Sequence, residues 1–125
     1  EGVVYGHLDH VNQLRAAGAQ MNVGRLTGGG ARSSVWTQIF ADALELPIEV
    51  PAASEIAAMG AAIAAGIGVG VYADYADAVA QAVQVVRRHE PQPEATGSYL
   101  ARYEEYRCLL EAMREPWQRL EKLGC

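Results

Sequence analysis

Leu26-Thr27-Gly28-Gly29-Gly30-Ala31-Arg32-Ser33-Ser34 is the most informative segment of this chain for its fold. The residues from Val23 to Thr27 predict a short buried strand, and the glycines that follow predict a tight turn. Ser33 or Ser34 can cap a helix after the turn, because a serine hydroxyl accepts hydrogen bonds from the free N–H groups of the first helical turn. This order of strand, glycine turn and helix is typical of an α/β fold.

The other segments predict more helices and short strands in alternation. We expect a helix over residues 2–17 that Gly18 ends, a second helix that Pro47 ends, and a strand over residues 48–50 closed by Pro51. A helix from a Ser54 cap to about Ile67 should follow, with Gly66, Gly68 and Gly70 unwinding its end. After it we expect a helix from an Asp74 cap to about Gln81, an extended segment over residues 83–88, and a last helix from about Glu94.

An apolar stripe runs along the last helix at spacings of three and four residues. It consists of Tyr99, Tyr103, Tyr106, Leu110, Met113, Trp117 and Leu120. We interpret the stripe as a surface that packs in the core, with a docking surface for a partner as the alternative. Pro116 is expected to kink this helix or to restart it, because proline removes a backbone donor.

Composition narrows the class of protein. Of 125 residues, 50% are hydrophobic and 20% are charged, which is typical of a packed globular domain. The net charge of −5 argues against binding to nucleic acid or to an anionic membrane. Cys108 and Cys125 do not make a disulfide framework, so reduced thiols and a cytoplasmic location are the simpler prediction.

Two further segments bear on how the chain is organised. Residues 56–73 carry no charge, but seven are alanine and four are glycine, so we expect a buried helix against a sheet, not a membrane span. The chain begins at Glu1 and has no methionine before Met21, so we expect it to be the C-terminal part of a larger protein. Apolar surface exposed by the missing part would favour self-association, and a homodimer is possible.

The glycine turn is the segment that carries chemistry. Glycines permit close approach of a ligand, and the start of the following helix offers free N–H groups, which together suit a phosphate. A structural turn without a ligand is the alternative. No Gly-Lys-Ser/Thr follows, so the turn is not a Walker A loop. It half-matches the dinucleotide fingerprint of redox enzymes, with Ser33 in place of the third glycine and Glu49 where a ribose-binding acid would lie.

Other polar residues are better explained by structure than by chemistry. His7 and His10 lack the further ligands that a metal site needs, so we predict no metal site. Asp42 and Glu55 have carboxylates that could act as a general base. A structural role is favoured for Asp42, and Glu55 is better explained as a charge in the first turn of a helix. His89 is expected in a solvated loop, and Cys108, on the last helix, has no partner motif for a nucleophile.

Several separate motifs resemble the FGGY family of carbohydrate kinases. The segment from Leu26 to Asp42 resembles the nucleotide-binding motif of that family, and the segment from Glu55 to Ala65 resembles the helix after it. Trp36, Gln38, Ala41, Asp42, Pro47 and Pro51 follow in family order. The resemblance covers residues 1–75 and, more loosely, the last helix. Within the family it is closest to the xylulose kinases and erythritol kinase.

This resemblance implies a fold and a function. The fold would be the C-terminal part of an actin/hexokinase/Hsp70-type, ribonuclease H-like nucleotide-binding domain, spanning residues 1–125. The chain would bind ATP or ADP with Mg²⁺, placing Gly28, Gly29 and Gly30 at the phosphates and Ala31 and Ser33 at the base. The phosphoryl acceptor would be a sugar or polyol, such as the pentulose xylulose.

In this family the sugar and the catalytic carboxylate belong to the N-terminal domain. The resemblance therefore implies no catalytic residue in this chain and no activity of the chain alone. Two other classes of function stay open at this point: a dinucleotide-binding part of an oxidoreductase, and a non-enzymatic α/β interaction module.

Overall fold

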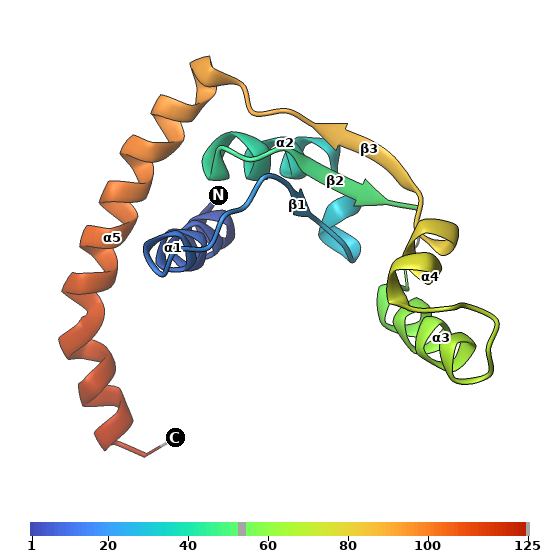
Figure 1. The fold of residues 1–125 in the computed structure, drawn as a ribbon. Helices are drawn as coiled ribbons and strands as arrows, with labels where there is room; N and C mark the ends of the chain where they lie inside the picture. Colours follow the sequence, from blue (N-terminus) through green and yellow to red (C-terminus); the bar gives the residue numbers. More distant parts are fainter. Residues whose placement is uncertain (53–54, 125) are drawn as a thin grey trace.

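Three short strands form one mixed sheet in the computed structural model, which describes residues 1–52 and 55–124. The strands are β1 (Gly24–Arg25), β2 (Ile48–Pro51) and β3 (Val85–His89), with β2 in the middle. β1 runs parallel to β2, and β3 runs antiparallel to it with Val50 opposite Arg87. This register brings β3, from late in the chain, next to the strand that follows the glycine turn (Figure 1).

The core lies between one face of the sheet and three helices. These are α1 (Gly2–Ala16), α2 (Ser34–Leu44) and the first half of α5 (Pro93–Lys122). The buried residues that form the core are Val4, Tyr5, Leu8, Phe40, Ala41, Ala43, Leu44, Leu46, Ile48 and Tyr103. An apolar face of α2 packs in this core: Phe40, Ala43 and Leu44 are buried, and Trp36 and Ile39 pack at its edge.

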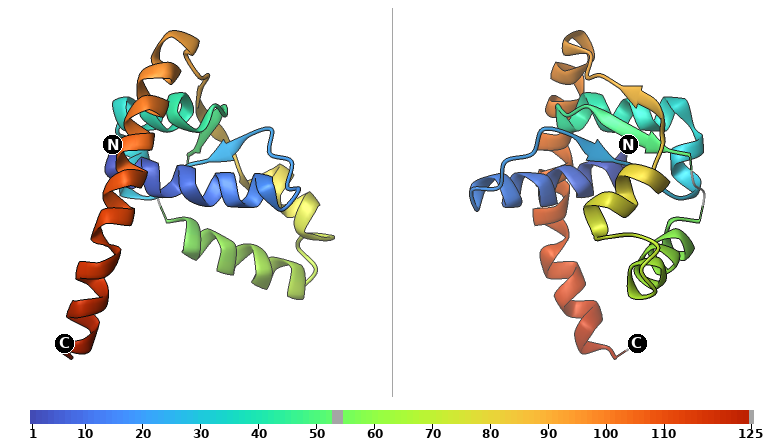
Figure 2. Two further views of the ribbon diagram at one scale, coloured as in Figure 1. Left: turned by 90° about the vertical axis from the view of Figure 1, so that its left-hand side faces the viewer. Right: turned by 45° about the vertical axis from the view of Figure 1, so that its right-hand side comes forward.

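Helices α3 (Ile56–Gly68) and α4 (Tyr75–Ala82) pack against each other at the opposite end of the molecule from α5 (Figures 1 and 2). The prediction that the uncharged helix is buried against a sheet is wrong for the described chain, because α4 is its main neighbour and Ile63 is its only buried residue. None of the described helices is both long and apolar enough to cross a membrane.

The apolar stripe of α5 divides into two halves. Tyr103 is buried, and Tyr99 and Tyr106 pack against the core. Beyond them the helix projects past α1 (Figure 1), and Trp117 is 57% exposed. The prediction of a packing surface is thus right for the first half of the stripe and wrong for the second. Pro116 lies inside one continuous helix, so the predicted restart does not occur.

Several predicted boundaries moved. β1 has two residues, and Val23 is 41% exposed, because β1 is an edge strand rather than the buried strand we expected. α2 ends at Leu44, where Glu45 takes a left-handed conformation with φ 54°, so Pro47 does not end it. α3 continues through Gly66 to Gly68. The expected Ser54 cap lies outside the described residues.

Other boundaries agree with the sequence. Gly18, with φ +89°, follows the end of α1, and its N–H bonds to the Arg15 carbonyl at 2.9 Å. Asp74 caps α4 by accepting from the N–H of Asp77 at 2.8 Å. Ser33 caps α2, because its Oγ accepts from the N–H of Trp36 at 3.2 Å. Local side-chain chemistry is sufficient to place these ends.

Candidate functional site

The glycine turn is a short 3₁₀ segment, η1 (Gly29–Arg32), that leads directly into α2. Within it the N–H of Ala31 donates to the Gly28 carbonyl at 3.2 Å, and the N–H of Ser33 donates to the Gly30 carbonyl at 3.1 Å. The turn is therefore an ordered, hydrogen-bonded structure in which each peptide group has a set direction.

The three glycines of the turn are required for different reasons. Gly28 has φ +80°, a conformation that residues with a side chain rarely adopt. Gly30 lies so close to the ring of Trp36 that a Cβ there would overlap it. Gly29 needs glycine for neither reason, since its φ is not positive and a Cβ there would meet no atom within 4 Å. The space beside Gly29 is open.

Two backbone donors of the turn have no protein partner in the described chain. Within residues 1–52 and 55–124, neither a carbonyl nor a side chain accepts a hydrogen bond from the N–H of Gly29 or Gly30. Unpaired backbone N–H groups need an acceptor from water or from a ligand. Such groups, close together in a glycine-rich turn, suit an anion.

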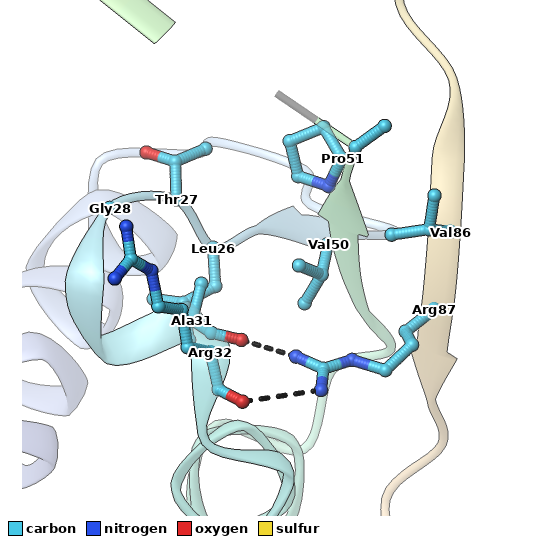
Figure 3. Close-up of a pocket in the computed structure, with 10 residues that line it drawn as sticks. Leu26, Thr27, Gly28, Ala31, Arg32, Val50, Pro51, Val86 and Arg87 are labelled. Atoms are coloured by element: carbon cyan, nitrogen blue, oxygen red, sulfur yellow. Dashed lines mark hydrogen bonds between the residues drawn. The ribbon is translucent and has the colours of Figure 1, made fainter. Parts of the chain in front are cut away.

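A cavity of about 380 Å³ adjoins the turn (Figure 3). Its described lining is Leu26, Thr27, Gly28, Ala31, Arg32, Val50, Pro51, Ala52, Val86 and Arg87. Two of these residues are arginines and none is acidic, so the cavity favours negative charge. Its size lies within the range of small-molecule sites, about 300–1,000 Å³. The turn forms one wall of the cavity, and the ends of β2 and β3 form the other.

The predicted nucleotide-binding residues do not all lie at this cavity. Gly28 and Ala31 line it, and Gly29 and Gly30 lie in the same turn. Ser33, predicted at the base, is exposed and does not line the cavity, and its hydroxyl caps α2. Its predicted contact with a base stays a prediction.

Asp42 has the structural role that the sequence favoured. Its carboxylate is 3% exposed and accepts hydrogen bonds from Gln38 Nε2 and from the N–H of Gln92, both at 2.8 Å. The Asp42 carbonyl accepts from Thr96 Oγ1 at 3.1 Å. His89 is not in a solvated loop as expected, because it ends β3, half-buried, with Nδ1 at 2.9 Å from Gln38 Oε1. These contacts join α2 to the start of α5.

Glu49 is held by two arginines, which bears on the dinucleotide alternative. One carboxylate oxygen lies 3.2 Å from Arg25 Nε and the other 2.9 Å from Arg88 Nη1. The hydrogen bond to Glu90 and, to a smaller extent, the one to Glu49 raise the pKa of Arg88. Both carboxylate oxygens of Glu49, the acid expected to bind a ribose in that alternative, are thus paired with arginines.

The remaining candidates are exposed. His7 and His10 lie on the surface of α1, with His7 beside the Phe40 ring. Glu55 stands at the N-cap position of α3 without making a side-chain cap. Cys108 is an exposed free thiol on α5, and Cys125 lies outside the described residues. Within the described part of the chain, no three His, Cys, Asp or Glu side chains are grouped as metal ligands.

Sequence reasoning missed Arg87, which it placed in the extended segment over residues 83–88 without a role. The guanidinium reaches from β3 to the carbonyls of Ala31 and Arg32 in the glycine turn (Figure 3). One signal could have indicated this contact. Consecutive residues of a strand point to opposite faces, so Arg87 and Arg88 cannot both point the same way.

Comparisons with known proteins agree with this fold. Residues 1–69 match the family model described as "FGGY family of carbohydrate kinases, C-terminal domain". The chain is 38% identical over 114 residues to the L-xylulose/3-keto-L-gulonate kinase of Escherichia coli K12, covering 91% of this chain and 23% of that protein. It is 36% identical over 106 residues to an autoinducer-2 kinase of Salmonella paratyphi B, covering 84% of this chain and 20% of that protein.

A solved structure shows the same arrangement of elements. The crystal structure of xylulose kinase from Rhodospirillum rubrum superposes with a TM-score of 0.72 at 30% identity, covering 92% of this chain and 23% of that one. The chain thus spans about a fifth of the length of the proteins that it matches. Together with the glycine turn and the fold around it, these matches show that the chain belongs to the FGGY family of carbohydrate kinases.

Proposed function

We propose that this chain is the C-terminal part of the nucleotide-binding domain of a carbohydrate kinase, and that its glycine turn binds the phosphates of ATP. The complete kinase would transfer the γ-phosphate to a hydroxyl of a sugar or polyol. The sugar and the group that deprotonates its hydroxyl would belong to another part of that kinase, and this chain would position the nucleotide.

The observation that carries the proposal is the open position at Gly29. Its N–H has no acceptor among the described residues, and the space beside its Cα is empty. A phosphate oxygen placed there would accept from this N–H and from that of Gly30. Family membership supports a nucleotide as the source of that phosphate.

Charge around the turn suits the same ligand. Arg32 is exposed and lines the cavity, as does Arg87, and no acidic residue lines it within the described chain. We propose that Ala31 and Ser33 lie on the side of the base. Arg32 is free to reach a phosphate or solvent.

The described residues do not form a Mg²⁺ site of their own. Mg²⁺ prefers carboxylate and other oxygen ligands, and the only side-chain oxygen in the cavity lining is the Thr27 hydroxyl. In this proposal Mg²⁺ arrives with the nucleotide phosphates, and no step is assigned to a metal ligand of this chain.

The names of the relatives support the proposed substrate class. Two of the matched proteins are named as kinases of xylulose, which supports a pentulose as the phosphoryl acceptor. Another matched protein is named an autoinducer-2 kinase, so similar chains also occur in kinases named for other substrates. A homodimer of the complete kinase is part of the same proposal.

An amide NMR titration of the chain with Mg-ADP, with NAD as the matched control, tests this proposal. We expect shifts centred on residues 28–33 with Mg-ADP and none with NAD. Shifts with NAD alone would revive the oxidoreductase alternative. If neither ligand moves these amides, the turn does not bind a nucleotide in this chain, and the proposal fails for it.

A further inference from the structure

Two neighbouring arginines of β3 point to opposite faces of the sheet. Arg88 is paired with carboxylates: Nη1 lies 2.9 Å from Glu49 and Nε lies 2.6 Å from Glu90. Arg87 makes no ion pair within the described chain, and its guanidinium instead meets backbone carbonyls. The two residues have the same side chain and adjacent positions but different partners.

Arg87 ties β3 to the glycine turn. Its Nη2 donates to the Ala31 carbonyl and its Nη1 to the Arg32 carbonyl at 3.5 Å (Figure 3). These two carbonyls are 56 and 55 residues before Arg87 in the sequence. The planar fork of a guanidinium fixes both acceptors at once, which a single-point donor does not do.

The hydrogen bond to the Arg32 carbonyl also orients the N–H of the same peptide group. The Arg32 carbonyl shares one planar peptide with the N–H of Ser33, so the two point in opposite directions. That N–H donates to the Gly30 carbonyl at 3.1 Å. Fixing the Arg32 carbonyl therefore also directs the bond that reaches Gly30.

The same link between a carbonyl and the N–H of its own peptide occurs again at Gly30 and at Gly28, and it leads to the N–H of Gly29. The Gly30 carbonyl shares its peptide with the N–H of Ala31, which donates to the Gly28 carbonyl at 3.2 Å. The Gly28 carbonyl shares its peptide with the N–H of Gly29, one of the two unpaired donors of the turn. Three linked peptides thus connect the guanidinium of Arg87 to the Gly29 N–H, and hydrogen bonds in such a chain polarise one another.

Arg87 also carries a cost that a purely stabilising residue would not need. Its Nε is buried and has no hydrogen-bond partner within the described chain. An unpaired buried donor is unfavourable, so the retention of this arrangement needs a reason beyond the stability of β3. The guanidinium adds positive charge at the wall of the cavity.

We propose that Arg87 is a positioning residue of the nucleotide site: it holds the glycine turn so that the N–H of Gly29 is aimed at the bound phosphate. This inference rests on the proposed function, because it assigns that phosphate to a nucleotide. Arg87 acts through the backbone of the turn and need not touch the ligand itself.

The test compares Arg87→Ala, Arg87→Lys and Arg88→Ala in the same chain. Arg88→Ala is the matched control, because it removes an arginine and its ion pairs from the same strand without touching the turn. Two quantities are measured for each variant: the amide shift and hydrogen exchange of Gly29 without ligand, and the Kd for Mg-ADP. The melting temperature of each variant is recorded beside them.

We expect Arg87→Ala to displace the Gly29 amide resonance, to speed its exchange and to raise the Kd about 10-fold or more, the range for loss of a charged hydrogen bond. Arg87→Lys keeps a donor but loses the fork, so it should fall between Arg87→Ala and the parent chain. Arg88→Ala should leave both quantities unchanged although it also lowers the melting temperature.

The outcomes separate this inference from the function beneath it. If the parent chain binds Mg-ADP and Arg87→Ala binds it equally well with an unmoved Gly29 amide, Arg87 has no positioning role and the proposed function stands. If Arg88→Ala weakens binding as much as Arg87→Ala, general destabilisation explains both and the inference fails. If Arg87→Ala does not fold, Arg87→Lys decides: parent-like affinity overturns the inference. A parent chain that ignores Mg-ADP overturns the proposed function instead, and this inference falls with it.

Discussion

Gln92 donates its backbone N–H to Oδ1 of Asp42 at 2.8 Å, and this bond attaches the residue just before α5 to α2. Gln38 Nε2 donates to the same oxygen at 2.8 Å and to the Glu90 carbonyl at 2.8 Å. The buried carboxylate of α2 is thus the point at which the segment after β3 is fastened to the core. A carboxylate that looks like a candidate base by residue type alone is engaged in holding the chain together.

Removing that carboxylate should destabilise the fold. Asp42→Ala removes the shared acceptor of the Gln92 N–H and of Gln38 Nε2, and the loss of hydrogen bonds to a charged group costs about 1.5–3 kcal/mol. Asp42→Asn keeps an oxygen in place and should cost less. Urea unfolding of both variants measures the difference, and equal losses would mean that the Gln92 bond contributes little.

Gly29 and Gly30 should respond differently to the same substitution. Gly30→Ala places a methyl group in the Trp36 ring and should cost about 1–3 kcal/mol, as overpacking does. It should also alter Trp36 fluorescence, read in a Trp117→Phe background. Gly29→Ala meets open space, so we expect an unchanged melting temperature and weaker Mg-ADP binding. A Gly29→Ala chain that binds Mg-ADP like the parent would contradict the phosphate position proposed here.

The free energy of unfolding should fall at alkaline pH. Burial raises the pKa of Tyr103, whose hydroxyl donates to Asp9 Oδ1 at 2.9 Å, and burial also raises the pKa of Tyr5. A tyrosine with a raised pKa holds its proton more tightly when folded. Its contribution to stability is therefore complete below the unfolded pKa of about 10 and is lost as the pH rises through the folded pKa.

Urea unfolding between about pH 8 and pH 11.5 measures this loss. Tyr103→Phe should flatten the pH dependence, although it also lowers stability at neutral pH by removing the bond to Asp9. Tyr75→Phe is the control, because Tyr75 is 64% exposed, and it should leave the curve unchanged. An equally steep decline in Tyr103→Phe would rule out Tyr103 as its source.

The second half of α5 should be much less stable than the first. From residue 107 to residue 124 no side chain is buried, and Pro116 lies in the helix interior. A helix without packing is marginal in water, and an interior proline costs about 3 kcal/mol. We expect fast amide exchange beyond residue 107, and higher helical circular dichroism for Pro116→Ala than for the neighbouring control Glu115→Ala. If amide exchange in this half were as slow as in α1, the half would have to be stabilised by contacts that the structure of this chain does not contain.

Much of the local structure could be predicted from the sequence. Asp74 and Ser33 cap their helices as expected, Gly18 follows the end of α1, and the glycine turn lies between a strand and a helix. The family could be predicted as well, because several motifs fall at the right spacing. Each of these features depends on residues close together in the chain.

The features that sequence reasoning missed depend on residues far apart. The bonds from Arg87 to the turn and from His89 to Gln38 span more than 50 residues, so only the packing of β3 beside β2 brings these partners together. An apolar pattern likewise predicts a face that can be buried, but burial requires a neighbour. The neighbours of α5 end near Tyr106, so Tyr103 is buried while Trp117, in the same stripe, is exposed. The glycine turn and the caps at Ser33 and Asp74 thus follow from short stretches of sequence, whereas the packing of distant elements sets which side chains are covered and which carbonyls Arg87 contacts.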